Sequence, residues 1–231
     1  MTVEIVKAKP EAPSKFLVIG EPFSGKTTLA AKSPKPLFIS TDGNAARAGL
    51  DAVNVRSVSD IRDALDLAIN SKDYQTIVID TIEGIVDMLT KDIIADFTTQ
   101  GFKLPSGASI QSLQDVPYGR ATGVLNAKIS AFANALASIN KNVIILSYSK
   151  RQVDDLTGSI ILASELKNIR LITRFMDAQI LTSFDGEKFK ANIINKRAIM
   201  AGEVEYGSIE PFLTAIGWDL PTKSVKLGKA R

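Results

Sequence analysis

Short runs of apolar residues recur along the chain, and each is bounded by polar or glycine-containing segments. Each run is too short for a stable helix, and most of its positions are apolar rather than alternately polar. This pattern is typical of strands buried on both faces of a sheet. The predicted strands cover residues 15–19, 37–40, 76–80 and 142–148, with a shorter one at 53–55.

The segments between these predicted strands have apolar residues at helical spacing. Between two of them, Ile61, Leu65 and Ala68 follow at intervals of three and four residues, and Ser59 stands where an N-cap is expected. Strands that alternate with helices predict a mostly parallel sheet covered by helices on both faces. The predicted helices begin or lie at residues 27–32, 59–71, 82–98, 119–139 and 209–216.

The C-terminal third changes from this alternation to a hairpin pattern. Residues 178–184 and 188–195 are strand-like and flank Asp185-Gly186, a dipeptide that favours a tight turn. Two polar segments, 101–118 and 150–159, are predicted to be loops. We therefore expect a lead-in over residues 1–14, one α/β domain with an antiparallel edge hairpin over 15–220, and a basic tail over 221–231.

Composition removes several kinds of chemistry. The 231 residues include no cysteine and no histidine, so disulfides, zinc–thiolate sites and imidazole bases are excluded. The net charge of +3 is too small to require a nucleic-acid partner by itself. The chain shows no apolar signal core and no apolar run of membrane-spanning length, so we expect a cytoplasmic protein with no membrane partner.

The segment GEPFSGKT, residues 20–27, has the spacing G-x-x-x-x-G-K-T between a predicted strand and a predicted helix. In such a loop, backbone N–H groups converge on phosphate, the lysine reaches the β- and γ-phosphates, and the threonine hydroxyl binds Mg²⁺. The alternative is a chance match on a glycine turn. We expect nucleotide binding by Gly20, Glu21, Pro22, Phe23, Ser24, Gly25, Lys26, Thr27 and Thr28.

A carboxylate ends the predicted strand TIVID. Asp80 has the position of a Walker B aspartate, which holds magnesium through water, and Thr27 would complete that site. The alternative is an ordinary aspartate before a turn. Together the two motifs predict ATP and Mg²⁺ as the cofactors, with Lys26 and Asp80 as catalytic residues.

Three further segments carry a resemblance to a known family. They are FISTDGNA at residues 38–45, NVIILSYSK at 142–150 and INKRA at 194–198. In this order after the phosphate loop, they resemble the small phage-encoded ATPases of the AAA family with a RecA/RadA core, which act in single-strand annealing and recombination. The resemblance covers about residues 15–207 and implies a RecA-like P-loop NTPase fold.

The resemblance also implies roles for particular residues. Asp42 would orient the attacking water, although the family usually has glutamate there. Ser147 or Tyr148 would sense the γ-phosphate, where related phage proteins often have histidine. Lys196 and Arg197 would reach the γ-phosphate of a neighbouring subunit. The alternatives are a plain Asp-Gly turn, a tyrosine at the rim of the core and a solvated basic turn.

The implied partner is single-stranded DNA, bound by a homo-oligomeric ring or filament in a bacterial or phage-infected cell, with a single-strand binding protein as a further candidate partner. The two predicted loops would face the DNA and supply Phe102, Lys103, Lys150 and Arg151. Two other functions stay open: a nucleotide switch or assembly factor with little turnover, and a small-molecule kinase. A kinase usually needs an arginine-rich lid, which is not evident in this sequence.

Overall fold

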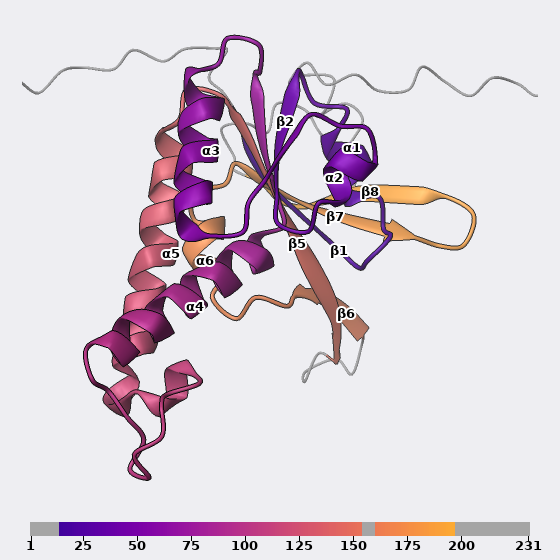
Figure 1. Ribbon diagram of the computed structural model, residues 1–231. Coiled ribbons are helices and arrows are strands. Elements are labelled where there is room, and N and C mark those ends of the chain that lie inside the picture. The colour runs from indigo at the N-terminus through magenta and orange to yellow at the C-terminus, as the bar shows by residue number, and fades with distance from the viewer. Residues whose placement is uncertain (1–13, 154–159, 197–231) are drawn as a thin grey trace, which may run out of the picture.

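The computed structural model describes residues 14–153 and 160–196, and its centre is one twisted sheet (Figure 1). Along the sheet the strands follow the order β3-β2-β4-β5-β1-β7-β8, with β6 paired to β5 outside this path. The strands are β1 (Lys15–Gly20), β2 (Pro36–Ser40), β3 (Ala52–Asn54), β4 (Thr76–Asp80), β5 (Asn142–Val153), β6 (Ile160–Ser164), β7 (Ala178–Phe184) and β8 (Phe189–Lys196).

Strand directions confirm the predicted architecture. The strands β1 to β5 and β7 pair in parallel, whereas β8 runs antiparallel to β7 and β6 runs antiparallel to the far end of β5. The mostly parallel sheet with an antiparallel C-terminal edge hairpin is therefore as expected from the sequence. Because parallel strands end at the same edge, the residues that follow β1, β2 and β4 meet there.

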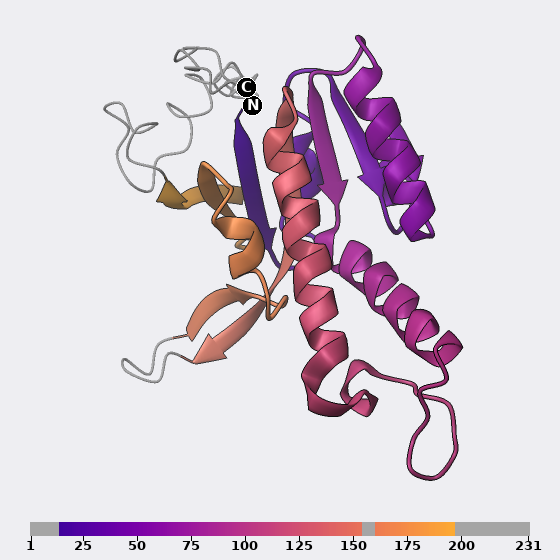
Figure 2. The same ribbon diagram turned by 90° about the vertical axis from the view of Figure 1, so that its left-hand side faces the viewer.

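Helices cover both faces of the sheet, as the continuous apolar strands require. On one face α3, α4, α5 and α6 share a core cluster with Leu17 and Ile19 of β1, and on the other α1 and α2 share a second cluster with Phe16 and Val18 (Figures 1 and 2). The helices are α1 (Lys26–Ala30), α2 (Asn44–Arg47), α3 (Val58–Asn70), α4 (Ile82–Thr99), α5 (Arg120–Ser138) and α6 (Arg170–Thr173).

Two local predictions were wrong. The N-cap of α3 is Ser57 and not Ser59, because Ser57 Oγ accepts from Asp60 N while the Asp60 carboxylate accepts from Ser57 N. The predicted loop at 150–159 begins instead as strand: β5 continues to Val153 and pairs with β6. The polar sequence of this edge hairpin hides its strand character. Residues 154–159, the helix expected at 209–216 and the basic tail lie outside the described residues.

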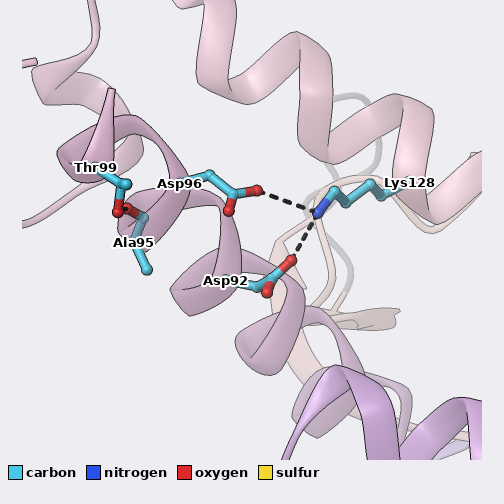
Figure 3. A network of polar contacts seen from close by, with 5 residues as sticks. All are labelled: Asp92, Ala95, Asp96, Thr99 and Lys128. Carbon is cyan, nitrogen blue, oxygen red and sulfur yellow. Dashed lines mark hydrogen bonds and ion pairs between the residues drawn. The ribbon is translucent and has the colours of Figure 1, made fainter. Parts of the chain in front are cut away.

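The helices α4 and α5 pack together and reach beyond the sheet (Figure 2). Lys128 of α5 ties them, with its Nζ 2.7 Å from Asp92 Oδ2 and 3.9 Å from Asp96 Oδ2 (Figure 3). Both acidic partners are partly exposed, so we expect about 0–1 kcal/mol from this network. At the far end the predicted loop contains two short 3₁₀ turns, Leu113–Asp115 and Pro117–Gly119. In the described part of the chain, no helix combines the length and apolar character needed to cross a membrane.

Candidate functional site

A cavity of about 500 Å³ opens at the carboxyl edge of the sheet, between β1, β4 and the hairpin β7–β8. It collects most of the residues that the sequence had singled out for phosphate binding. Its lining is Pro22, Phe23, Ser24, Gly25, Lys26, Thr27, Thr28, Asp42, Asn44, Asp80, Thr81, Tyr148 and Phe189. Three other cavities of about 350–410 Å³ are lined by described residues outside the loop between β1 and α1.

The loop between β1 and α1 is shaped by its two glycines. A Cβ on Gly20 would overlap the hydroxyls of Ser24 and Thr182, so this position has no room for a side chain. Gly25 has φ of 88°, in the left-handed region that favours glycine. Ser24 Oγ and Thr182 Oγ1 are buried and hydrogen-bonded at 2.8 Å, which fastens the loop to β7. Sequence reasoning missed Thr182, since a single threonine in a strand has no distinctive pattern.

Lys26 lies inside this loop rather than on the surface. Its Nζ donates to Gly20 O and Glu21 O, both at 2.9 Å, and lies 4.6 Å from the centroid of the Tyr148 ring. Burial lowers the pKa of Lys26, and the nearby carboxylates of Asp80, Glu83 and Glu165 oppose that shift. The ammonium group is thus partly stripped of water and surrounded by the loop, an arrangement suited to binding an anion.

Thr27 and Asp80 come together from different elements. Thr27 Oγ1 donates to Asp80 Oδ2 at 3.1 Å, joining the start of α1 to the end of β4. Asp80 is only 4% exposed. Burial is the main reason why its pKa rises to about 6; Asp42 and Glu83 add to the rise, while Thr27 and Lys26 counteract it. A carboxylate held in this way gains from the arrival of a cation.

Asp42 lies at the rim of the same cavity and is exposed. It folds back on its own turn, because Oδ1 accepts from Asn44 N at 2.9 Å and Oδ2 accepts from Asn44 Nδ2. Ser40 Oγ also donates to Oδ1 at 3.3 Å. The structure therefore brings Asp42 to the predicted place while using both of its oxygens in the turn.

The two candidate sensor residues have different surroundings. Tyr148 lines the cavity and lies against Lys26, and burial together with the carboxylates of Asp42, Asp80 and Glu83 raises its pKa. Ser147 is fully buried, and its Oγ donates to Glu83 Oε1 at 2.6 Å. Of the two, only Tyr148 reaches the cavity.

Glu83, in the first turn of α4, is a residue that sequence reasoning missed. Its Oε1 also accepts from Tyr148 N at 3.0 Å, and Ser147 Oγ is 3.0 Å from Ser164 Oγ of β6. Burial raises the pKa of Glu83, although hydrogen bonds from Ser147, Tyr148 and Thr81 limit the rise. Glu83 thereby connects the start of α4 with the middle of β5 and, through Ser147, with the end of β6. A glutamate near a helix start usually suggests only a surface residue.

The contribution of the Glu83 carboxylate to the stability of the fold can be tested by substitution. Glu83→Ala leaves Tyr148 N without its acceptor and removes the shortest hydrogen bond of Ser147 Oγ, and we expect a loss of about 1–3 kcal/mol in the free energy of unfolding. Glu83→Gln keeps an acceptor oxygen, so it should lose much less. Urea denaturation measures both, with exposed Glu187→Ala as the control. An alanine variant as stable as the parent would contradict this role.

The predicted DNA-facing residues are not gathered in one place. Phe102 packs edge-on against Phe97, with ring centroids 5.0 Å apart, and Arg120 lies 5.4 Å from its centroid. Phe102 is thus engaged within the protein rather than free to stack. Lys103 and Lys150 are exposed, and Lys150 belongs to β5 and not to a loop.

Arg151 likewise lies in β5, where only its backbone is described. Lys196 ends β8, and again only its backbone is described. Arg197 lies outside the described residues.

The residues present fit a magnesium nucleotide. Hydroxyl and carboxylate oxygens are the ligands that Mg²⁺ prefers, and Thr27 and Asp80 provide one of each. Within residues 14–153 and 160–196 there is no cluster of three acidic side chains able to hold a metal alone. A magnesium ion here would therefore depend on phosphate oxygens as well, as Mg²⁺ does in nucleotide sites.

The fold and this cavity define a P-loop nucleotide-binding protein. The model of a protein family described as AAA domain matches residues 12–173, and the chain belongs to that family. No curated protein sequence matches the chain. Solved structures that resemble it include the crystal structure of the RadB recombinase, with 15% sequence identity, a TM-score of 0.47 and coverage of 81% of this chain and 83% of that chain.

Proposed function

We propose that this protein hydrolyses ATP in the presence of Mg²⁺ and acts on single-stranded DNA during recombination or strand annealing, as a phage-type RecA-like ATPase. The observation that carries the nucleotide part is the meeting of Lys26, Thr27 and Asp80 in one cavity of about 500 Å³. Lys26 and Thr27 begin α1, whereas Asp80 ends β4, so two motifs that are distant in the sequence meet in this cavity. Membership of the AAA-domain family supports the same reading.

Each residue would have a distinct part in that reaction. The backbone of residues 20–28 and the Lys26 ammonium would hold the triphosphate, because they are already arranged around the cavity. Thr27 and Asp80 would hold the magnesium ion, which when bound neutralises charge on the phosphate oxygens. Asp42 would orient water after release from Asn44, and Tyr148, which contacts Lys26, would sense the γ-phosphate.

The proposed DNA binding rests on the positions of two projecting segments more than on particular side-chain contacts. Loop 100–119 and the β5–β6 hairpin both project from the lower end of the molecule in the two views (Figures 1 and 2). Exposed Lys103 and Lys150 lie on these two projections, and we propose that each projection contacts DNA separately, Phe102 from within the first and Arg151 from the second. Cations on projecting segments can follow a phosphate chain without reading bases.

A single subunit with net charge +3 would bind DNA weakly, so the proposal includes an oligomer, as a ring or filament. Lys196 and Arg197 would then reach a neighbour's γ-phosphate and make hydrolysis depend on assembly. A single-strand binding protein is a further proposed partner, and the proposed setting is the cytoplasm of a bacterial or phage-infected cell.

The test is phosphate release from ATP and Mg²⁺, with and without single-stranded DNA, over a range of protein concentrations. We expect DNA to stimulate release and the rate to rise more steeply than the protein concentration. The Lys26→Ala variant is the negative control, because any phosphate released in its presence comes from contaminating ATPases. Release that is indifferent to DNA and proportional to protein would contradict the shared-site recombination ATPase and favour a small-molecule enzyme.

One observation favours a second function, a nucleotide switch or assembly factor with little turnover. Both oxygens of Asp42 accept hydrogen bonds from Asn44, which leaves the candidate base engaged in its turn. Tight ATP binding without phosphate release would support the switch. Restored release in Asn44→Ala, which removes the Nδ2 hydrogen bond but keeps the one from the backbone N–H, would show that the Asn44 side chain restrains the base.

A further inference from the structure

Two exposed aromatic residues lie side by side on the C-terminal hairpin, next to the phosphate loop. Phe184 ends β7 and Phe189 begins β8, and the two are directly paired across the strands. Their ring centroids are 4.7 Å apart with an interplanar angle of 32°. They are 49% and 64% exposed, so neither ring is explained by packing in the core.

The Phe189 ring is nevertheless held in place. A Cβ on Gly25 would lie 2.9 Å from Phe189 Cδ1, so the ring edge rests where the loop has no side chain. Phe184 supports the ring from the neighbouring strand. The absence of a side chain at Gly25 therefore serves a second purpose besides the left-handed turn, since it lets an aromatic ring approach the phosphate loop closely.

Phe189 is the one residue that the hairpin contributes to the cavity lining among the described residues. The cavity thus has a charged part, formed by Lys26, Thr27 and Asp80, and an aromatic part at Phe189. This is the combination that a nucleotide requires, with a charged phosphate group joined to a flat aromatic base. The other aromatic rings of the lining are less suited: Tyr148 is occupied by Lys26, and Phe23 is 95% exposed.

We propose that Phe189, supported by Phe184, is a stacking platform for the nucleobase of the bound nucleotide. The inference rests on the proposed nucleotide binding and adds the residue that recognises the base. Because every base has a π face, the platform favours nucleoside triphosphates over inorganic triphosphate without selecting one base. ATP and GTP should therefore both benefit from it.

The test compares ATP with inorganic tripolyphosphate by isothermal titration calorimetry, with Mg²⁺ and without DNA. Loss of a base–aromatic stack corresponds to roughly tenfold weaker binding. We expect Phe189→Ala to weaken ATP binding by about that factor while leaving tripolyphosphate binding unchanged. Tyr118→Ala is the matched control, since it removes an aromatic side chain that is 99% exposed far from the cavity.

A second substitution provides a spectroscopic measurement. Phe189→Trp keeps a stacking surface, so ATP affinity should be retained. The new tryptophan emission should be quenched by ATP and not by tripolyphosphate, with the unsubstituted chain and its one native tryptophan as the baseline.

Other outcomes would overturn the platform. Equal weakening of both ligands by Phe189→Ala would mean that the ring shapes the phosphate loop. Unchanged binding of both would place the base elsewhere, and a change in sedimentation without a change in ATP affinity would make the pair a subunit contact. If the unsubstituted protein bound neither ligand, the proposed function itself would fail, a result distinct from any of these.

Discussion

Lys26→Ala is expected to weaken ATP binding by at least about 100-fold and to abolish measurable phosphate release. Lys26 is only 5% exposed, its Nζ is held near the Tyr148 ring by two backbone carbonyls, and no other lysine of the described residues lines the cavity. Since the ammonium is already desolvated, its interaction with a phosphate is stronger than that of a surface lysine. Calorimetry and phosphate-release assays measure the two effects.

The control for this substitution is Lys32→Ala, which removes a lysine from just beyond α1 but not from the cavity lining. It should bind ATP as the parent does. Circular dichroism and thermal unfolding establish that Lys26→Ala is folded. Hydrolysis at the parental rate by folded Lys26→Ala would remove the basis for nucleotide chemistry in this cavity.

Asp80→Asn is expected to lower Mg²⁺-dependent phosphate release by at least about 100-fold. The substitution keeps the size of the side chain and an oxygen that can accept from Thr27, but it removes the charge that attracts magnesium. Binding of ATP measured without Mg²⁺ should change little, because Lys26 and the loop remain. Loss of metal-free ATP binding as well would mean that Asp80 supports the loop rather than the metal.

The same substitution should stabilise the nucleotide-free protein at neutral pH. The pKa of Asp80 is raised to about 6 from its ordinary value of 3.8, chiefly by burial. Between these two values the folded chain holds a proton that the unfolded chain has lost, so stability falls as the pH rises through this range. A shift of this size corresponds to about 3 kcal/mol at pH 7.5, where the folded protein carries a buried charge.

Urea denaturation at pH 7.5 and pH 4 therefore distinguishes charge from shape. We expect Asp80→Asn to be more stable than the parent at pH 7.5 and close to it at pH 4. Asp63→Asn, on the exposed side of α3, is the matched control and should show neither effect. If the two pH values gave the same difference, burial of the Asp80 charge would not be its cause.

Much of the fold could be predicted because its strands are buried on both faces. Runs such as TIVID do not alternate between apolar and polar residues, so the local sequence predicted strands that are buried in a parallel sheet. The dipeptide Asp185-Gly186 predicted the edge hairpin. The continuation of β5 to Val153 could not be predicted in this way. Residues 150–159 have the polar, glycine-containing composition of a loop, and only the pairing with β6 identifies residues 150–153 as strand.

The residues of the candidate site also form two groups, those that the sequence predicted and those that it did not. Lys26, Thr27 and Asp80 were identifiable because phosphate and magnesium impose fixed spacings and a strand end on them. Glu83, Thr182 and Phe189 were not, because each acts through a neighbour distant in sequence. Glu83 bonds with residues of β5, Thr182 with the phosphate loop and Phe189 rests on Gly25. No local pattern encodes such contacts.

The helix α4 has a mechanical consequence for the molecule. It begins directly after Asp80-Thr81 at the cavity and runs for 18 residues, about 27 Å at the rise of an α-helix. A tilt of about 10° at its first residue would move its last residue by about 5 Å. Because α4 and α5 pack against each other, both helices would move together. A small movement at the cavity would therefore be enlarged at loop 100–119, which joins the far ends of α4 and α5.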